Sequence, residues 1–207
     1  LRQAGAKIEG DGTSRIIVNG VQSLNGIDKY HVMPDRIEVG TLLLAGAITK
    51  GDVTVTNAKH SHLECFIDKL DQAGLDITCE DNAIRCQYNG GIKAIDFETE
   101  PHPGFPTDLQ AQLMALMCVA EGKSVIKEKI FENRFMHVNE LKRMGASIST
   151  DGRIAVVKGS KLSGAEVKIT DLRAGAALIL AGLVADGTTT VYGLKHLNRG
   201  YYNLLEK

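Results

Sequence analysis

The sequence contains no tryptophan and is poor in proline, cysteine and aromatic residues, with 4 Pro, 4 Cys and 5% aromatics among 207 residues. Four cysteines without C-x-x-C spacing exclude a disulfide scaffold, so we expect Cys65, Cys79, Cys86 and Cys118 to be buried, reduced thiols of a cytoplasmic protein. The longest apolar stretch, residues 174–185, falls short of the roughly 20 residues of a membrane helix. We therefore expect no membrane partner.

An excess of charge of either sign is also lacking. The 24 Lys+Arg are balanced by 25 Asp+Glu, which gives a formal net charge of −1. That balance leaves no basic surface for nucleic acid, so any anion site must be built from local arginines. His60 and His62 have no third ligand nearby, and no phosphate-binding loop or dinucleotide fingerprint is present. We expect no metal and no cofactor.

Internal repeats are what the sequence does have. LRQAGAKI at 1–8, LDQAGLDI at 70–77 and LKRMGASI at 141–148 nearly coincide, and each is followed by a turn and a strand-like segment. A second series, with glycines Gly51, Gly122 and Gly187, ends an apolar helix before a β-branched strand. The repeat unit is about 70 residues long and predicts α/β repeats, an α+β packing in which the apolar helices are buried.

The helix over 61–73 is the amphipathic exception, and strands are expected at 52–57 and 123–128. The repeats begin and end out of phase with the chain. We therefore expect the 207 residues to be cut from a longer protein at both ends.

An acidic residue stands at the start of each apolar helix: Asp35, Asp108 and Asp171. Because it recurs in every repeat, the first interpretation is that each carboxylate caps unpaired N–H groups. The alternative is that a carboxylate held at a helix start serves as a base for a substrate hydroxyl.

Three arginines are candidates for anion binding. Arg134 lies in a polar turn that could be a solvated corner or could direct a guanidinium into a cleft. Arg173 places a positive charge at the start of its helix, where the helix dipole disfavours it. Its position therefore needs another explanation, such as an anionic ligand or Asp171. Arg199, beside Gly200, is either part of a surface loop or an anion contact.

Six segments together resemble one family. They are GAKIEGDGTSRIIVNGV, VMPDRIEVGT, PHPGFPTDLQAQ, IFENRFMHVNELKRMGA, LSGAEVKITDLRAGAALILAGLVADGTT and HLNRGYYNLLEK. In this order they are similar to the motifs of the bacterial UDP-N-acetylglucosamine 1-carboxyvinyltransferases, the UDP-GlcNAc enolpyruvyl transferases of peptidoglycan synthesis.

This resemblance implies an inside-out α/β barrel of two lobes, each built from three βαβαββ units. Residues 1–33 would end one lobe, and residues 34–207 would form most of the other, about two and a half units. The implied reaction transfers enolpyruvyl from phosphoenolpyruvate to the 3′-hydroxyl of UDP-N-acetylglucosamine, by addition and elimination and without a metal. The implied partners are these two substrates and the missing N-terminal lobe.

The resemblance also assigns residues. Asp108 matches the carboxylate proposed as general base, and Thr107 and Ile130 match contacts to the sugar nucleotide. Arg199 matches the arginine that holds phosphoenolpyruvate. Arg134 and Arg173 match arginines of the cleft that are associated with substrate charge and with closure of the lobes. Asp35 and Asp171 match helix starts that we interpret as structural caps or as support for the site.

The chain departs from the family pattern in three ways. Asn198 replaces an acid before Arg199, and Gly175 replaces a serine. The loop that carries the family's reactive cysteine precedes this segment, so none of the four cysteines is assigned a catalytic role. Two alternatives stay open: a catalytically silent module that binds nucleotide sugars, and a transferase of the same fold that uses another acceptor.

Overall fold

The computed structural model describes residues 1–204 and 206–207 together with the backbone of residue 205, and it divides into two compact units. The first unit, Leu1–Met33, contains a short 3-10 helix, η1 (Arg2–Ala4), and an antiparallel hairpin of β1 (Lys7–Glu9) and β2 (Ile17–Asn19). Its apolar residues are largely exposed, with Val18 at 65% and Val32 at 83%.

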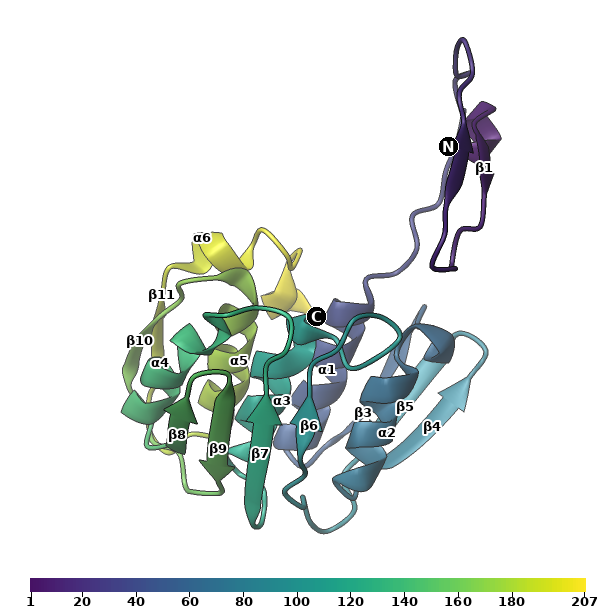
Figure 1. Ribbon diagram of the computed structural model, residues 1–207. Coiled ribbons are helices and arrows are strands. Elements are labelled where there is room, and N and C mark those ends of the chain that lie inside the picture. The colour runs from purple at the N-terminus through teal and green to yellow at the C-terminus, as the bar shows by residue number, and fades with distance from the viewer. The chain divides into compact units, whose positions relative to one another are not determined.

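Three apolar helices lie at the centre of the second unit, Pro34–Lys207 (Figure 1). They are α1 (Arg36–Ile48), α3 (Gln110–Met117) and α5 (Leu172–Gly182). The three helices contact one another and are buried on most sides, because their sequences are apolar nearly all round. Glycine allows α1 to approach the turn that leads into α3, since a Cβ on Gly40 would come within 2.7 Å of the Leu109 side chain.

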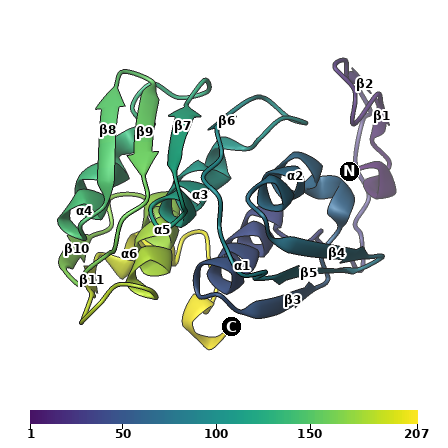
Figure 2. The same ribbon diagram turned by 90° about the horizontal axis from the view of Figure 1, so that it is seen from below.

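The strands of the second unit lie outside these helices, in three sheets within the part of the chain that the structure describes (Figure 2). Their orders are β3-β5-β4, β6-β7-β9-β8 and β10-β11. The bounds are β3 (Asp52–Thr56), β4 (Asp76–Glu80), β5 (Ala83–Gln87), β6 (Phe97–Glu98), β7 (Lys123–Lys127), β8 (Ser147–Asp151), β9 (Ile154–Lys158), β10 (Glu166–Lys168) and β11 (Thr190–Tyr192). In the second sheet, β7 pairs in parallel with β6 and antiparallel with β9.

The other helices connect these elements. They are α2 (Glu64–Gln72), α4 (Val138–Arg143), α6 (Leu194–Leu197), and the 3-10 helices η2 (His60–His62), η3 (Thr107–Leu109), η4 (Arg134–His137) and η5 (Leu204–Glu206). The helix expected over 61–73 is therefore shorter, because a 3-10 turn precedes it. Its apolar stripe is buried as expected, at Leu63, Phe66, Ile67 and Leu70.

The repeat is visible in the order of elements, since β6-α3-β7-α4-β8-β9 forms one complete βαβαββ unit. With helices inside and sheets outside, the expected fold class is confirmed. Gly5, Gly74 and Gly145 all adopt left-handed backbone, with φ of 95°, 89° and 87°. At the end of α1 the left-handed residue is Lys50 rather than Gly51, so that glycine does not end the helix in the expected way.

The cysteines divide into two classes. Cys86 and Cys118 are buried, and burial raises the pKa of each thiol to about 12. Cys65 is half-buried and Cys79 is exposed, so the expectation that all four are buried is wrong. Cys79 lies near the end of β4, which is the edge strand of its sheet and leaves this side chain uncovered. No helix in the described part of the chain is both long and apolar enough to cross a membrane.

Candidate active site

The three acidic residues at the helix starts differ in what they bind. Asp35 caps α1, accepting a hydrogen bond from the Ile37 amide at 2.8 Å. Asp171 caps α5, accepting from the amides of Arg173 and Ala174 at 2.9 Å each. For these two residues the capping interpretation is confirmed.

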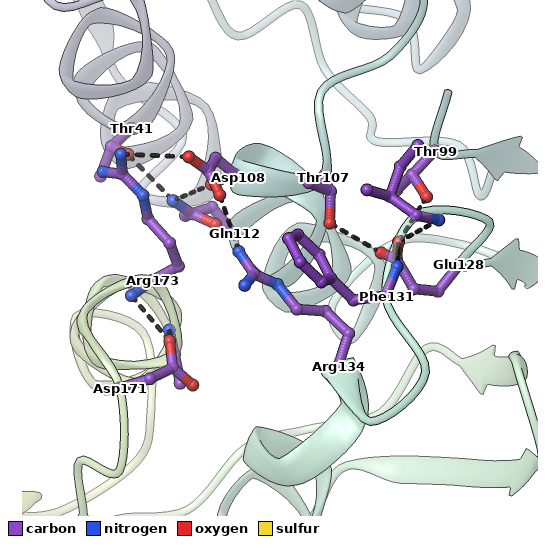
Figure 3. A network of polar contacts seen from close by, with 12 residues as sticks. Thr41, Thr99, Thr107, Asp108, Gln112, Glu128, Phe131, Arg134, Asp171 and Arg173 are labelled. Atoms are coloured by element: carbon purple, nitrogen blue, oxygen red, sulfur yellow. Dashed lines mark hydrogen bonds and ion pairs between the residues drawn. The ribbon is translucent and has the colours of Figure 1, made fainter. Parts of the chain in front are cut away.

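Asp108 lies instead in the 3-10 turn η3, one turn before α3, and its side chain makes no capping hydrogen bond. Arg134 Nη2 donates to Asp108 Oδ1 at 2.8 Å, and Arg173 Nη2 donates to Oδ2 at 3.3 Å. Figure 3 shows the carboxylate between the two guanidinium groups. The capping interpretation is therefore wrong for Asp108, because the tighter turn directs its side chain away from the helix amides.

The ion pairs also explain Arg173. Its guanidinium opposes the dipole of α5 but meets the carboxylate of Asp108, whereas Asp171 contacts only its backbone amide. The Arg173 side chain is 14% exposed, and its Nη1 atom is buried with no hydrogen-bond partner. The Asp108 side chain is 42% exposed, so its carboxylate remains accessible from outside the cluster of Asp108, Arg134 and Arg173.

An open pocket of about 590 Å³ adjoins this cluster. Its lining includes Ile130, Phe131, Arg134, Arg153 and Asp171. The Arg134 guanidinium lies over the Phe131 ring, with 5.2 Å from Cζ to the ring centroid, and so links the pocket to Asp108. The pocket therefore combines charged groups of both signs, since Glu132 also lines it, with the exposed ring of Phe131.

Thr107 and Ile130 meet at one buried carboxylate that sequence reasoning missed. The Thr107 hydroxyl and the Ile130 amide both donate to Glu128, each at 2.9 Å. Glu128 directly follows β7, where Ser124 and Ile126 are buried on alternate positions. Glu128 is the next position in this buried alternation, and that pattern could have indicated its burial from the sequence.

Arg199 lies outside the cluster. It is exposed in the turn after α6, and none of its side-chain atoms has a hydrogen bond or ion pair to another residue in the part of the chain that the structure describes. The next residues are close to the cluster, since a Cβ on Gly200 would be 3.6 Å from Arg173 Nη1. The structure thus brings Arg134 and Arg173 together at Asp108. Arg199 is not part of this cluster, although the next residue in the chain lies close to Arg173.

Tyr201 anchors the segment that carries Arg199. It is 1% exposed, and its hydroxyl lies 2.9 Å from Thr41 Oγ1 and accepts from Gln112 Nε2 at 3.1 Å. Gln112 Nε2 also donates to the backbone carbonyl of Asp108 at 2.9 Å. Arg173 Cζ lies 5.6 Å from the centroid of the Tyr201 ring. This buried polar network, likewise missed by sequence reasoning, links the C-terminal segment to α1 and to the turn of Asp108.

The two departures from the family pattern have simple surroundings. Asn198 is exposed at the C-cap of α6. Gly175 is buried in α5, and a Cβ there would lie 3.0 Å from Ile169 and 3.3 Å from Leu197. The glycine therefore makes room for these side chains. No group of three or more His, Cys, Asp or Glu in the described residues is placed to hold a metal ion.

Comparison with known proteins gives consistent matches. A model of the EPSP synthase (3-phosphoshikimate 1-carboxyvinyltransferase) family matches residues 1–207. The UDP-N-acetylglucosamine 1-carboxyvinyltransferase of Desulfosudis oleivorans is 56% identical over 208 residues, covering 100% of this chain and 50% of that protein. UDP-N-acetylglucosamine 1-carboxyvinyltransferase 2 of Staphylococcus saprophyticus is 54% identical, covering 99% and 48%. These relatives confirm the resemblance seen in the motifs.

Solved structures agree. The crystal structure of the enolpyruvyl transferase NikO from Streptomyces tendae matches with a TM-score of 0.87 and 30% identity, over 100% of this chain and 50% of that one. EPSP synthase from Acinetobacter baumannii matches with a TM-score of 0.76 and 22% identity, over 97% and 50%, and shares the fold. The chain spans about half the length of the curated relatives it matches.

Proposed function

The chain belongs to the EPSP synthase (3-phosphoshikimate 1-carboxyvinyltransferase) family, and on that premise we propose that it forms part of a UDP-N-acetylglucosamine enolpyruvyl transferase. The choice of acceptor is supported by the names of relatives that are 54–56% identical over nearly all of this chain. The remaining half, including the loop with the reactive cysteine, would come from the N-terminal lobe of the same protein. The enzyme would act in peptidoglycan synthesis in the bacterial cytoplasm.

One observation carries the proposal: the partly exposed carboxylate of Asp108 held between Arg134 and Arg173. In the proposed reaction the 3′-hydroxyl of the sugar nucleotide adds to C2 of phosphoenolpyruvate. Asp108 accepts the hydroxyl proton, while C3 gains a proton from a group outside this chain. Loss of inorganic phosphate and of one proton from C3 then restores the double bond in the enolpyruvyl ether.

The arginines would bind the negative charges of both substrates. Phosphoenolpyruvate carries a phosphate and a carboxylate, and planar guanidinium groups bind such oxygens in pairs. An incoming anion can draw Arg134 or Arg173 away from Asp108, which frees a carboxylate oxygen for the hydroxyl proton. The buried Nη1 of Arg173 already lacks a partner. We assign Arg199 to phosphoenolpyruvate, because its guanidinium is exposed and the adjoining glycine lies close to Arg173.

Thr107 and Ile130 would contact the sugar nucleotide through the groups that do not already donate a hydrogen bond to Glu128. The Thr107 hydroxyl donates its proton to Glu128, so toward a substrate it can only accept. The Ile130 amide is also occupied, so its side chain and carbonyl are left for the ligand. Ile130 lines the open pocket, which is consistent with this role.

Turnover by the full-length protein tests the proposal. Phosphate release should be observed with phosphoenolpyruvate plus UDP-N-acetylglucosamine and not with phosphoenolpyruvate plus shikimate 3-phosphate. Asp108→Asn should lower kcat by about 10²–10⁴-fold, the usual contribution of a general base. Asp76→Asn is the matched control, because Asp76 is exposed on β4 and, among the described residues, its side chain hydrogen-bonds only Asn89.

Three results would contradict the proposal in different ways. Preference for shikimate 3-phosphate would favour another acceptor, and binding of UDP-N-acetylglucosamine without turnover would favour the silent module. A wild-type kcat in Asp108→Asn would remove Asp108 as the base. The 207-residue chain by itself should not turn over, since the proposed proton donor lies outside it.

A further inference from the structure

Glu128 is a carboxylate buried at 1% exposure, directly after β7. Among the described residues, no Lys, Arg or His forms an ion pair with it. A charged group removed from water costs several kcal/mol unless hydrogen bonds replace its hydration. A glutamate at this position therefore depends on the donors around it.

Four donors surround the carboxylate (Figure 3). Glu128 Oε1 accepts from Thr99 Oγ1 at 2.8 Å and from the amides of Ile130 and Phe131 at 2.9 and 3.0 Å. Oε2 accepts from Thr107 Oγ1 at 2.9 Å. An ionised carboxylate offers about four lone-pair sites, so this set meets its capacity. The charge is compensated entirely by hydroxyl and amide groups.

The donors come from three separate segments. Thr99 follows β6, Thr107 opens the turn η3, and the two amides belong to the turn after β7. Thr107 is the residue before Asp108, and Phe131 lies three residues before Arg134. Glu128 thus joins the two stretches of backbone that carry the partners of the Asp108–Arg134 ion pair.

We propose that Glu128 is a positioning residue, whose carboxylate sets the separation and orientation of Asp108 relative to Arg134 and the Phe131 ring. It acts through Thr107 on one side and through the Ile130 and Phe131 amides on the other. The inference rests on the proposed function, because Asp108 is the base in that reaction. Glu128 itself meets no substrate, since its side chain is buried beneath the two segments.

The structure gives reasons to assign this role rather than simple filling of the core. A glutamate that served packing alone could be replaced by an apolar residue of similar size at little cost. Here that replacement would leave the two backbone amides and the two hydroxyl protons without their acceptor, and three of these four donors lie in the segments that carry Asp108 and Arg134. Displacement of a reacting group by about 1 Å can cost about 100-fold in rate.

Variants of Glu128 in the full-length protein test the inference. Glu128→Ala should lower kcat about 100-fold, as expected for a base displaced by about 1 Å. Glu128→Gln should recover kcat to within about 10-fold, because its oxygen still accepts three hydrogen bonds and its amide can donate to the Thr107 hydroxyl. Glu98→Gln is the matched control, since Glu98 is a partly exposed glutamate on β6 that pairs with Lys129.

A double-mutant cycle with Asp108→Asn separates positioning from general support of the fold. If Glu128 acts through Asp108, then Glu128→Ala should cost less than about 3-fold in the Asp108→Asn background, because the two effects are coupled. Equal losses in both backgrounds would overturn the positioning role. A wild-type kcat in Asp108→Asn alone would overturn the proposed function instead.

Thr99→Val provides a second variant in case Glu128→Ala does not fold. It removes one donor to Oε1, together with the acceptor of the Lys129 amide, and keeps the shape of the side chain. We expect a loss in kcat of about 3–10-fold, because three of the four donors to Glu128 remain, and the loss should again be reduced in the Asp108→Asn background. An unchanged kcat in Thr99→Val, or a loss of the same size in both backgrounds, would also overturn the inference.

Discussion

Asp108 and Asp171 occupy equivalent places in the repeat, each at the start of a buried helix, yet their carboxylates do different work. Asp171 accepts two amide hydrogen bonds of α5, in the same way as Asp35 caps α1. Asp108 accepts none from α3 and instead meets two guanidinium groups. The structural difference is small, a 3-10 turn inserted before α3.

This difference shows how a repeated fold can acquire a reactive group. A cap uses the carboxylate for the stability of its own helix, whereas a carboxylate released from capping is available to a ligand. The turn of Asp108 is supported from elsewhere: Gln112 donates to its carbonyl and Glu128 holds its neighbour Thr107. Stability and chemistry are thereby assigned to different side chains at this helix start.

The largest predicted effect on stability is a loss at low pH. It arises at His137, and it should depend on the charge of Asp171 but not on that of Asp108. This histidine is fully buried, and burial lowers its pKa to about 4, while the charge of Asp171 acts in the opposite direction. Because the unfolded chain binds the proton with a pKa near 6.5, stability is complete above that pH and is lost as the pH falls toward 4. We expect a loss of about 2–3 kcal/mol at about pH 4.5 relative to neutral pH.

Urea unfolding of the 207-residue chain at the two pH values measures this effect. His137→Gln should remove most of the pH dependence, and His60→Asn, at an exposed histidine, should not. Asp171→Asn keeps a capping oxygen but removes the charge, so it should steepen the loss. A similar steepening in Asp108→Asn would break the distinction between the two aspartates.

The next effect tests the network that supports the turn of Asp108. Tyr201→Phe removes the hydroxyl that lies between Thr41 and Gln112 and leaves both buried groups with one partner fewer. The free energy of unfolding should fall by about 1–2 kcal/mol. Tyr202→Phe is the control, because Tyr202 is 79% exposed. Equal urea midpoints for the two variants would show that the network does not support the fold.

Removal of a cap should cost somewhat less. Asp171→Ala loses two hydrogen bonds to helix amides and should destabilise the chain by about 1 kcal/mol. Asp35→Ala loses one such hydrogen bond. Its destabilisation should therefore be about 0.5 kcal/mol, at the lower end of the range for caps. Both are measured as shifts of the urea midpoint. The reverse order would contradict the interpretation that the number of amide partners sets the effect.

The smallest effect on stability is expected at the residue with the largest proposed effect on turnover. Asp108→Asn should change the free energy of unfolding by less than about 0.5 kcal/mol, because partly exposed ion pairs contribute little and no cap is lost. Thermal or urea unfolding beside wild type provides the measurement. A loss as large as that of Asp171→Ala would mean that Asp108 also supports its helix, and the comparison would fail.

The sequence predicted the local features well, for physical reasons. The repeat, the buried helices and the caps at Asp35 and Asp171 depend on short-range patterns of apolar residues, glycines and acids. The environment of Asp108 could not be read in the same way, because its partners Arg134 and Arg173 lie 26 and 65 residues further along the chain. They come together because α5 packs against both α3 and the turn η4, which carries Arg134.

Two other features show the same limit. Glu128 was missed although it continues the buried alternation of β7, because a charged residue is normally assigned to the surface. Cys79 was assigned to the core although its strand lies at a sheet edge, and strand order cannot be read from one segment. In both cases the identity of the neighbouring segment decides burial.

The hydrogen bond between Thr41 and Tyr201 also has a consequence for the order of folding. The two residues are 160 positions apart. At about 5–20 residues per second, a ribosome takes roughly 10–30 s to synthesise that stretch. Throughout this time the Thr41 hydroxyl on α1 lacks the Tyr201 hydroxyl, with which it is buried in the finished structure. The contact between α1 and the segment of Tyr201 therefore forms late in synthesis, after the residues that separate the two partners have been made.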